Sequence, residues 1–92
     1  LIIQKEQTDV YPIYPNPASE QVKIGFRMSD GDAATLTIFD NNGKMVELLE
    51  DATYFSKGKH LLTYNTQHLN PGMYRFIIDV NGEQKSTNFV VK

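Results

Sequence analysis

The sequence contains no cysteine, no tryptophan and no long apolar run. Without cysteine neither a disulfide nor a thiolate metal site can form, so packing and backbone hydrogen bonds must hold the fold. No stretch approaches the roughly 20 apolar residues that a membrane-spanning helix needs, and no signal peptide is present. These absences leave a small domain without covalent cross-links.

The sequence also has no large excess of positive or negative charge. Nine basic and eleven acidic residues give a net charge of −2, and the basic residues form no cluster. Nucleic-acid binding needs a concentrated positive surface, so that class is excluded. Ninety-two residues, 40% of them hydrophobic, suffice for one domain with a single core. Because the chain begins with Leu1 and not with Met, we expect it to be part of a larger protein.

Helix patterns are nearly absent, and apolar residues recur instead at every second position. The clearest case is the run of Val22, Ile24, Phe26 and Met28. Successive side chains of a strand point to opposite faces of its sheet, so this alternation predicts a half-buried antiparallel strand. Turn residues at 29–32 end it.

A hairpin is predicted around residues 41–43, which read Asn-Asn-Gly. A strand from 34 to 40 precedes this loop, and a second strand from 44 to about 49 follows it. A three-residue loop with Gly43 in the left-handed conformation forms a type I turn with a bulge.

The register of this hairpin follows from its turn. Asp40 is expected opposite Lys44, an opposite-charge pair at the turn. The resulting register places Ile38 opposite Val46 and Leu36 opposite Leu48. Both apolar pairs then share one face of the sheet, so we expect this register to be well specified.

Two more turn signals organise the second half of the chain. Residues 70–72, Asn-Pro-Gly, predict a type II turn with a positive φ at Gly72. Asn81-Gly82 predicts a two-residue hairpin loop. That loop pairs Val80 with Glu83 and Tyr74 with Phe89. Strands are expected at 59–65, 73–80 and 84–92.

Residues 11–17 contain three prolines, each of which lacks a backbone donor. This segment is therefore expected as an edge strand that breaks into an extended turn. Residues 1–10 are interpreted as a linker or loosely attached segment, and residues 11–92 as the domain. About seven short strands separated by turns predict an all-β, immunoglobulin-like antiparallel sandwich of the Greek-key type.

No residue pattern indicates catalysis or metal binding. His60 and His68 have no carboxylate at a spacing that would orient either ring, so packed or solvated histidines are expected. The acidic turns at 30–32 and 40–43 do not fit the calcium-loop pattern, and calcium needs six to eight oxygen ligands. No serine stands in a nucleophile motif. We therefore expect no enzyme, no metal and no cofactor.

Four stretches, taken together, resemble a known family. They are Tyr-Pro-Asn-Pro-Ala-Ser at 14–19, the hairpin at 36–46, Leu-Asn-Pro-Gly-Met-Tyr at 69–74, and the closing strand at 85–92. In order and spacing they are similar to the type A C-terminal sorting domain of the type IX (Por) secretion system of Bacteroidetes. The resemblance covers residues 11–92. One departure is Ser-Thr-Asn at 86–88, where the family often carries two adjacent basic residues.

This resemblance implies a secretion tag carried by a larger cargo protein. Such domains reach the periplasm by a separate signal and are recognised by the outer-membrane translocon. A sortase-like peptidase then typically removes them, and the cargo is released or linked to lipopolysaccharide at the cell surface. The implied partners are the translocon with its shuttle proteins and that peptidase.

The residues of the four stretches fall into two groups. Turn geometry or packing explains Pro15, Pro17, Asp40, Gly43, Lys44, Gly72, Tyr74 and Gly82. The candidates for recognition are Asn16, Lys85, Phe89, Val90 and Lys92. A closing strand with an unpaired edge would suit recognition by strand addition.

Two other functions stay open. The domain could be an immunoglobulin- or fibronectin-like spacer of a secreted enzyme, or a carbohydrate-binding module. A spacer predicts that the parent chain continues beyond residue 92, whereas a sorting domain predicts that it stops there. A carbohydrate-binding module predicts several coplanar exposed aromatic side chains.

Overall fold

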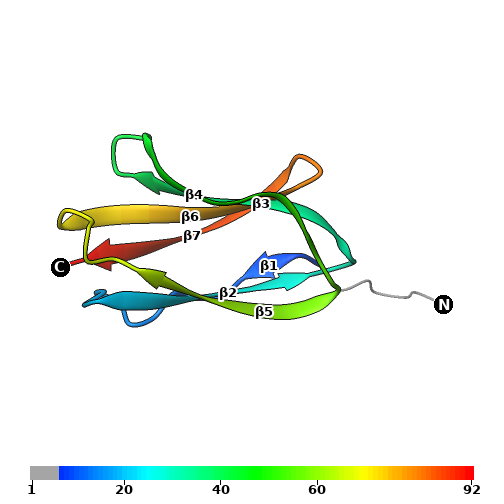
Figure 1. Ribbon diagram of the computed structural model, residues 1–92, viewed down its shortest axis with the longest axis horizontal. Helices are drawn as coiled ribbons and strands as arrows, with labels where there is room; N and C mark the ends of the chain where they lie inside the picture. Colours follow the sequence, from blue (N-terminus) through cyan, green and yellow to red (C-terminus); the bar gives the residue numbers. More distant parts are fainter. Residues whose placement is uncertain (1–6) are drawn as a thin grey trace.

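The computed structural model describes residues 7–92, and its regular structure consists of seven β-strands. The strands are β1 (Asp9–Val10), β2 (Gln21–Met28), β3 (Asp32–Asp40), β4 (Met45–Phe55), β5 (Gly58–Asn65), β6 (Gly72–Val80) and β7 (Glu83–Val91). They form two antiparallel sheets, one of order β1-β2-β5 and one of order β4-β3-β6-β7 (Figure 1). The predicted all-β sandwich is confirmed.

The chain changes sheets between β2 and β3, between β4 and β5, and between β5 and β6. This path brings β3 beside β6 and β2 beside β5, as in a Greek key. No helix that could cross a membrane occurs between residues 7 and 92.

The core lies between the sheets and confirms the period-two predictions. Val22, Ile24, Phe26 and Met28 of β2 are all 0% exposed. From the other sheet, β3, β6 and β7 contribute the buried side chains of Leu36, Ile38, Tyr74, Phe76, Ile78, Phe89 and Val91. Fully burying one large apolar side chain contributes about 1.5–3 kcal/mol, so these rows dominate the stability of the domain.

The β6–β7 hairpin has the predicted register. Val80 pairs with Glu83, and Tyr74 pairs with Phe89. Asn81 and Gly82 both have positive φ angles, 55° and 85°, as a type I′ turn requires. The two stacked rings of Tyr74 and Phe89 have centroids 5.7 Å apart.

The β3–β4 hairpin begins as predicted and then departs from the prediction. The Asp40 backbone N donates to the Lys44 carbonyl over 2.8 Å, and Gly43 has a φ of 80°. Further along, the register shifts, so that Ile38 lies opposite Glu47 and Leu36 opposite Glu50. The predicted partners Val46 and Leu48 are therefore wrong.

Bulges in β4 explain this difference. Val46 and Leu49 both pack against the core although they lie three positions apart, and Leu48 points outward with 46% exposure. An extra residue inserted in one strand reverses which of its side chains point inward. The bulges thus bring Val46 and Leu49 to the core, which a regular period of two cannot do.

The turn before β6 also differs from the prediction. Gly72 has a φ of 156° and already belongs to β6, whereas a type II turn would place it near +80°. The hydrogen-bonded turn lies earlier, where the Leu69 N donates to the Thr66 carbonyl over 3.0 Å. The Tyr74 hydroxyl donates to the Asn70 carbonyl over 2.6 Å. A tyrosine near the start of this strand, bonded to backbone a few residues upstream, is the tyrosine corner of immunoglobulin-like sandwiches.

The proline-rich segment lies at the edge of the three-stranded sheet. Tyr14 forms an isolated bridge to Lys23 of β2, and Ile13 is buried. Before it, Asp9–Val10 pair with β2 as β1, although this pair falls within the stretch interpreted as a linker. Residues 1–6 of that stretch lie outside the described residues, and the domain boundary at residue 11 stays a prediction.

Candidate recognition surface

Four stretches that are distant in the sequence meet at one end of the sandwich. Asp40 pairs with Tyr74, Tyr74 with Phe89, and Gly72 with Val91. Ala18 bridges Val91 in parallel orientation. Figure 1 shows the β3–β4 hairpin, the β5–β6 loop and the end of β7 at this same end. We call it the motif end: residues 14–18, 40–45, 66–74 and 89–92.

The opposite end carries the other connections, at 29–31, 56–57 and 81–82. β1 starts nearer that end, because Asp9 pairs with Arg27. From there the chain runs along β2 and reaches the motif end at residues 14–18. β1 itself therefore lies away from the motif end.

Residues 14–18 are hydrogen-bonded to the edge of β7. The Val90 N donates to the Asn16 Oδ1 over 2.9 Å, and the Ala18 N donates to the Val90 carbonyl over 2.7 Å. Both outward backbone groups of Val90 are thus occupied. The expectation of an unpaired edge on the closing strand is wrong at this position, because the proline-rich segment takes the place that an added strand would occupy.

The five recognition candidates have different positions. Asn16 and Lys92 are exposed at the motif end, and Val90 beside them is half-buried. Phe89 is fully buried, so its side chain contacts the core and not the surface. Lys85 pairs with Ile78, seven residues from Lys92, or about 23 Å at 3.3 Å per residue. Lys85 is therefore remote from the motif end.

The residues attributed to turn geometry lie at the motif end with one exception. The Asp40 Oδ1 accepts hydrogen bonds from the Asn42 N at 2.8 Å and from the Lys44 N at 3.0 Å, which fixes the hairpin loop. Pro15 and Pro17 follow cis peptide bonds on either side of Asn16. Gly82 lies at the opposite end.

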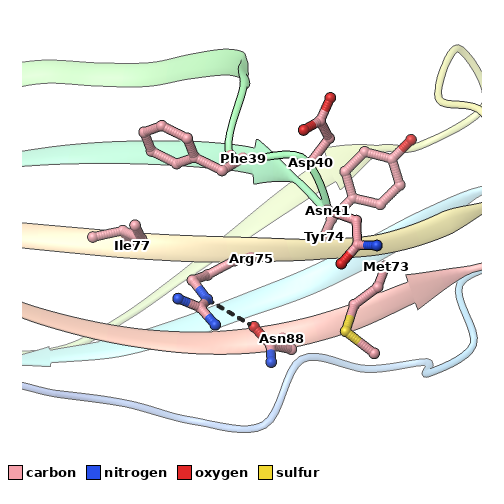
Figure 2. A pocket seen from close by; sticks show the side chains of 9 residues that line it. Phe39, Asp40, Asn41, Met73, Tyr74, Arg75, Ile77 and Asn88 are labelled. Carbon is pink, nitrogen blue, oxygen red and sulfur yellow. Dashed lines mark hydrogen bonds between the residues drawn. The ribbon is translucent and has the colours of Figure 1, made fainter.

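A shallow hollow of about 270 Å³ lies on the outer face of the four-stranded sheet beside the motif end. Figure 2 shows Phe39, Ile77 and Met73 around it, with Arg75 pointing toward Asn88. The Arg75 Nε donates to the Asn88 Oδ1 over 3.1 Å. Met73 is 47% exposed, so apolar surface is accessible here.

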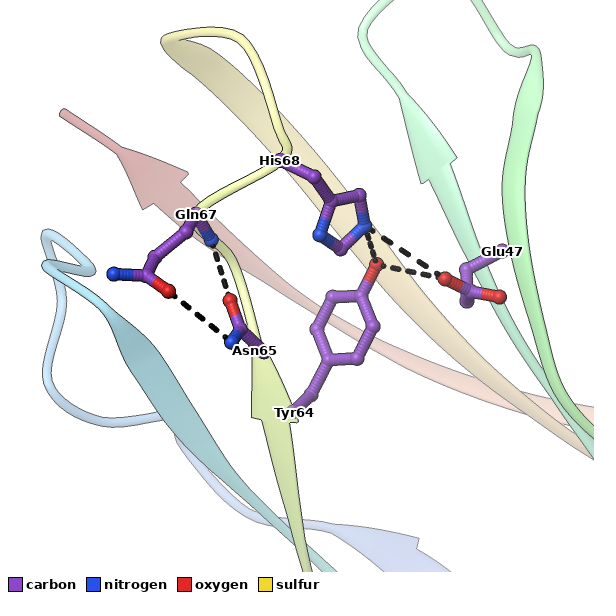
Figure 3. A network of polar contacts seen from close by, with 5 residues as sticks. All are labelled: Glu47, Tyr64, Asn65, Gln67 and His68. Carbon is purple, nitrogen blue, oxygen red and sulfur yellow. Dashed lines mark hydrogen bonds and ion pairs between the residues drawn. The ribbon is translucent and has the colours of Figure 1, made fainter.

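A polar network joins the two sheets and was missed by the sequence analysis. The Tyr64 hydroxyl on β5 donates to the Glu47 Oε1 on β4 over 3.2 Å and lies 3.1 Å from the His68 Nε2 (Figure 3). His68 and Glu47 approach to 3.8 Å. The sequence offered no carboxylate at a spacing that would orient His68, and Glu47 lies close enough for a long ion pair but not for a hydrogen bond to the ring. Glu47 is 21 positions away in the sequence, and only the sheet packing brings it near.

Burial, followed by the charge of Glu47 and its hydrogen bond, raises the pKa of Tyr64 from 10.0 to about 12. A tyrosine held in its neutral form is the opposite of an activated nucleophile. His60 lies elsewhere, stacked on Phe26 at 5.3 Å and edge-on to Phe55, with its Nε2 2.8 Å from the Ser56 carbonyl. Among residues 7–92, no three histidine or carboxylate side chains form a group that could hold a metal ion.

Comparison with known families identifies the domain. Residues 12–92 match the family model of the secretion system C-terminal sorting domain. The chain belongs to this family. No match is found among curated proteins.

The sorting domain is the signal for type IX secretion, and it directs the cargo that carries it. It interacts with the secretion machinery as part of that cargo, and export proceeds toward the cell surface or the extracellular space. The family is not known to be catalytic. The motif end of the sorting domain thus contains part of each of the four stretches that resemble the family.

Proposed function

We propose that the sorting domain is a non-catalytic tag and that the type IX machinery recognises the folded motif end. The convergence of the four stretches carries this proposal. Turn geometry alone would not require all four to meet at one place, because Asn81-Gly82 forms an equally regular turn at the opposite end. A single surface made from four distant stretches exists only in the folded state, so recognition would also report that folding is complete.

The finer steps of export belong to the same proposal. The domain would pass through the periplasm as part of its cargo, bind the translocon and its shuttle proteins, and then be removed by a sortase-like peptidase. The cargo would be released or linked to lipopolysaccharide. The start of β1 at Asp9, near the opposite end, is compatible with recognition of the motif end while a cargo precedes the domain.

The five recognition candidates differ in position, and the roles that we propose for them differ accordingly. We propose that Asn16 and Lys92 contact the secretion machinery through their exposed side chains. Val90 would contact it either beside the proline-rich segment or after that segment has moved away from β7. Phe89 would act indirectly, by holding β7 in the core. Lys85 would contribute little to a surface centred on the motif end.

The carbohydrate-binding alternative finds less support. Among the described residues, the large aromatic side chains with high exposure are Tyr14 at 55% and Tyr54 at 69%. Tyr14 lies at the motif end, whereas Tyr54 pairs with Ala33 near the opposite end. They do not form one stacking platform.

A secretion assay with exposed charges tests the proposal. A reporter fused in front of the domain would carry Lys44→Glu together with Lys92→Glu, both exposed at the motif end. The control is Lys57→Glu, an exposed charge reversal at the opposite end. We expect the double variant to accumulate in the periplasm and the control to be secreted, with unchanged far-ultraviolet circular dichroism in both. Normal secretion of the double variant would contradict the proposal. Deleting residues 88–92 is a weaker test, because it also removes the buried Phe89 and Val91.

A further inference from the structure

The outer face of the four-stranded sheet departs from the usual pattern of a solvated face. Its outward positions near the motif end include Phe39 of β3 and Met73 and Ile77 of β6, which line the 270 Å³ hollow. On the far side of Thr37, which pairs with both Ile77 and Leu48, Leu48 of β4 is 46% exposed. Exposed apolar side chains gathered in one patch are typical of interaction sites, whereas single ones are ordinary.

The charged group in this hollow is the guanidinium of Arg75, which uses only part of its hydrogen-bonding capacity. The hydrogen bond from the Nε of Arg75 to Asn88 holds the guanidinium against β7. Within residues 7–92 no other acceptor bonds Arg75. Two carboxylates near this hollow already accept hydrogen bonds: Asp40, at the end of β3, accepts from its own loop, and Asp79, on the outer face, accepts from the Gly82 N and the Gln84 Nε2. The terminal amino groups of Arg75 therefore remain available for an outside acceptor.

The apolar side chains of the hollow and the adjacent Arg75 together determine which kind of ligand would fit there. Guanidinium donors match a carboxylate in two parallel hydrogen bonds. A small inorganic anion would leave Phe39, Met73 and Ile77 uncovered, whereas a peptide side chain next to a carboxylate would cover them. Aromatic, methionine and arginine side chains are also the types enriched at protein interfaces.

We propose that this hollow is a docking site for a peptide segment of the secretion machinery that presents an apolar side chain next to a carboxylate. The carboxylate bonds Arg75, and the apolar side chain lies between Phe39, Met73 and Ile77. This inference rests on the proposed function, and it adds the outer sheet face and the chemistry of the partner to the motif end.

A binding experiment with two matched probes tests the chemistry. The isotope-labelled domain is titrated with the blocked peptide acetyl-Phe-Leu-Glu-amide and, separately, with acetyl-Phe-Leu-Gln-amide, while nuclear magnetic resonance follows all amides and the methionine methyls. We expect saturable shifts centred on Phe39, Met73, Arg75 and Ile77, with the glutamate peptide binding about tenfold more tightly than the glutamine peptide. Arg75→Gln should remove this preference, and Lys57→Gln, an equal loss of charge at the opposite end, should keep it. Equal binding of both peptides, or shifts centred elsewhere, overturns the proposal.

The secretion assay separates this inference from the function on which it rests. Reporter fusions with Arg75→Gln should be retained in the periplasm, and those with Lys57→Gln should be secreted. If Arg75→Gln is secreted normally while the Lys44→Glu and Lys92→Glu pair is retained, the docking site is wrong and the motif end stands. If both are secreted, the motif end is wrong as well. A domain that dimerises through this face, with Arg75→Gln restoring the monomer in sedimentation, would show a second copy as the occupant and would also overturn the proposal.

Discussion

At the scale of single residues, Asn16 has a role that its sequence context does not reveal. Its amide oxygen accepts the hydrogen bond of the Val90 N–H, at a β7 edge where another strand could otherwise pair. A proline-flanked asparagine in a sequence suggests only a turn. Its partner is 74 positions away, so the contact depends on how β7 returns past the start of the domain.

Asn16→Ala should therefore loosen the edge of β7. The Val90 N–H loses its acceptor, and a lost hydrogen bond of this kind costs about 0.5–1.5 kcal/mol. Hydrogen exchange should become faster at the Val90 amide and stay unchanged at amides in the middle of β6. Asn16→Asp keeps an oxygen at the same place and should keep the protection. Equal exchange rates at Val90 in wild type and Asn16→Ala would show that the contact carries no weight.

Tyr74 is a second residue for which the sequence pattern predicted only part of the role. Its ring was predicted in the core and is buried there, but its hydroxyl also bonds the Asn70 carbonyl. Tyr74→Phe keeps the ring and removes this bond, so we expect the free energy of unfolding to fall by about 1 kcal/mol in urea denaturation. Tyr54→Phe, which alters an exposed ring, should leave it unchanged. A Tyr74→Phe variant as stable as wild type would contradict a stabilising tyrosine corner at this position.

At the scale of elements, the regular strands could be predicted from the sequence and the irregular one could not. The alternation in β2 gives its buried face directly, and Asn81-Gly82 fixes the register of β6 against β7. In β4 the same reasoning failed. The sequence allows Val46 and Leu48, or Val46 and Leu49, to point inward, and the choice is made by contacts with the opposite sheet. The network of Glu47, Tyr64 and His68 was missed for the same reason, since its members lie on β4, β5 and the following loop.

One bulge of β4 places Ala52 at a φ of 49°, a left-handed conformation that is costly for alanine. Ala52→Gly relieves this cost, although glycine also gains freedom in the unfolded chain. We expect a net increase in the free energy of unfolding of up to about 1 kcal/mol, measured by urea denaturation. Ala33→Gly in the regular part of β3 should act in the opposite direction. A loss of stability in Ala52→Gly would argue against the bulge.

The link between β4 and β5 should also give the domain a pH dependence. The unfolded chain releases the Tyr64 proton near pH 10, whereas the folded domain holds it to about 12. The folded state thus binds more protons between these values, and its stability should fall as pH rises from 10 to 12. Between pH 8 and pH 11.5, the midpoint of urea denaturation should fall less in Tyr64→Phe than in wild type. Tyr54→Phe should keep the wild-type drop, and an equal drop in all three proteins would refute the role of Tyr64.

At the scale of the whole molecule, two parts of the sandwich have different roles. The core between the sheets stabilises the domain, and the motif end gathers the stretches that distinguish this family from other small sandwiches. The sequence revealed these stretches one by one and predicted the fold class. It could not show that they share one surface, because their proximity follows from the Greek-key path and from the contact between residues 16–18 and β7.

The most direct test of the motif end as the secretion signal is the secreted fraction of a reporter with one bulky substitution at either end. Asn70→Trp and Ser56→Trp both replace an exposed side chain in a loop, the first at the motif end and the second at the opposite end. Thermal denaturation of the two purified domains first confirms similar stability. We expect Asn70→Trp to retain the reporter in the periplasm and Ser56→Trp to secrete it at the wild-type level. Equal secretion of the two variants, or loss of secretion only with Ser56→Trp, would contradict the central claim.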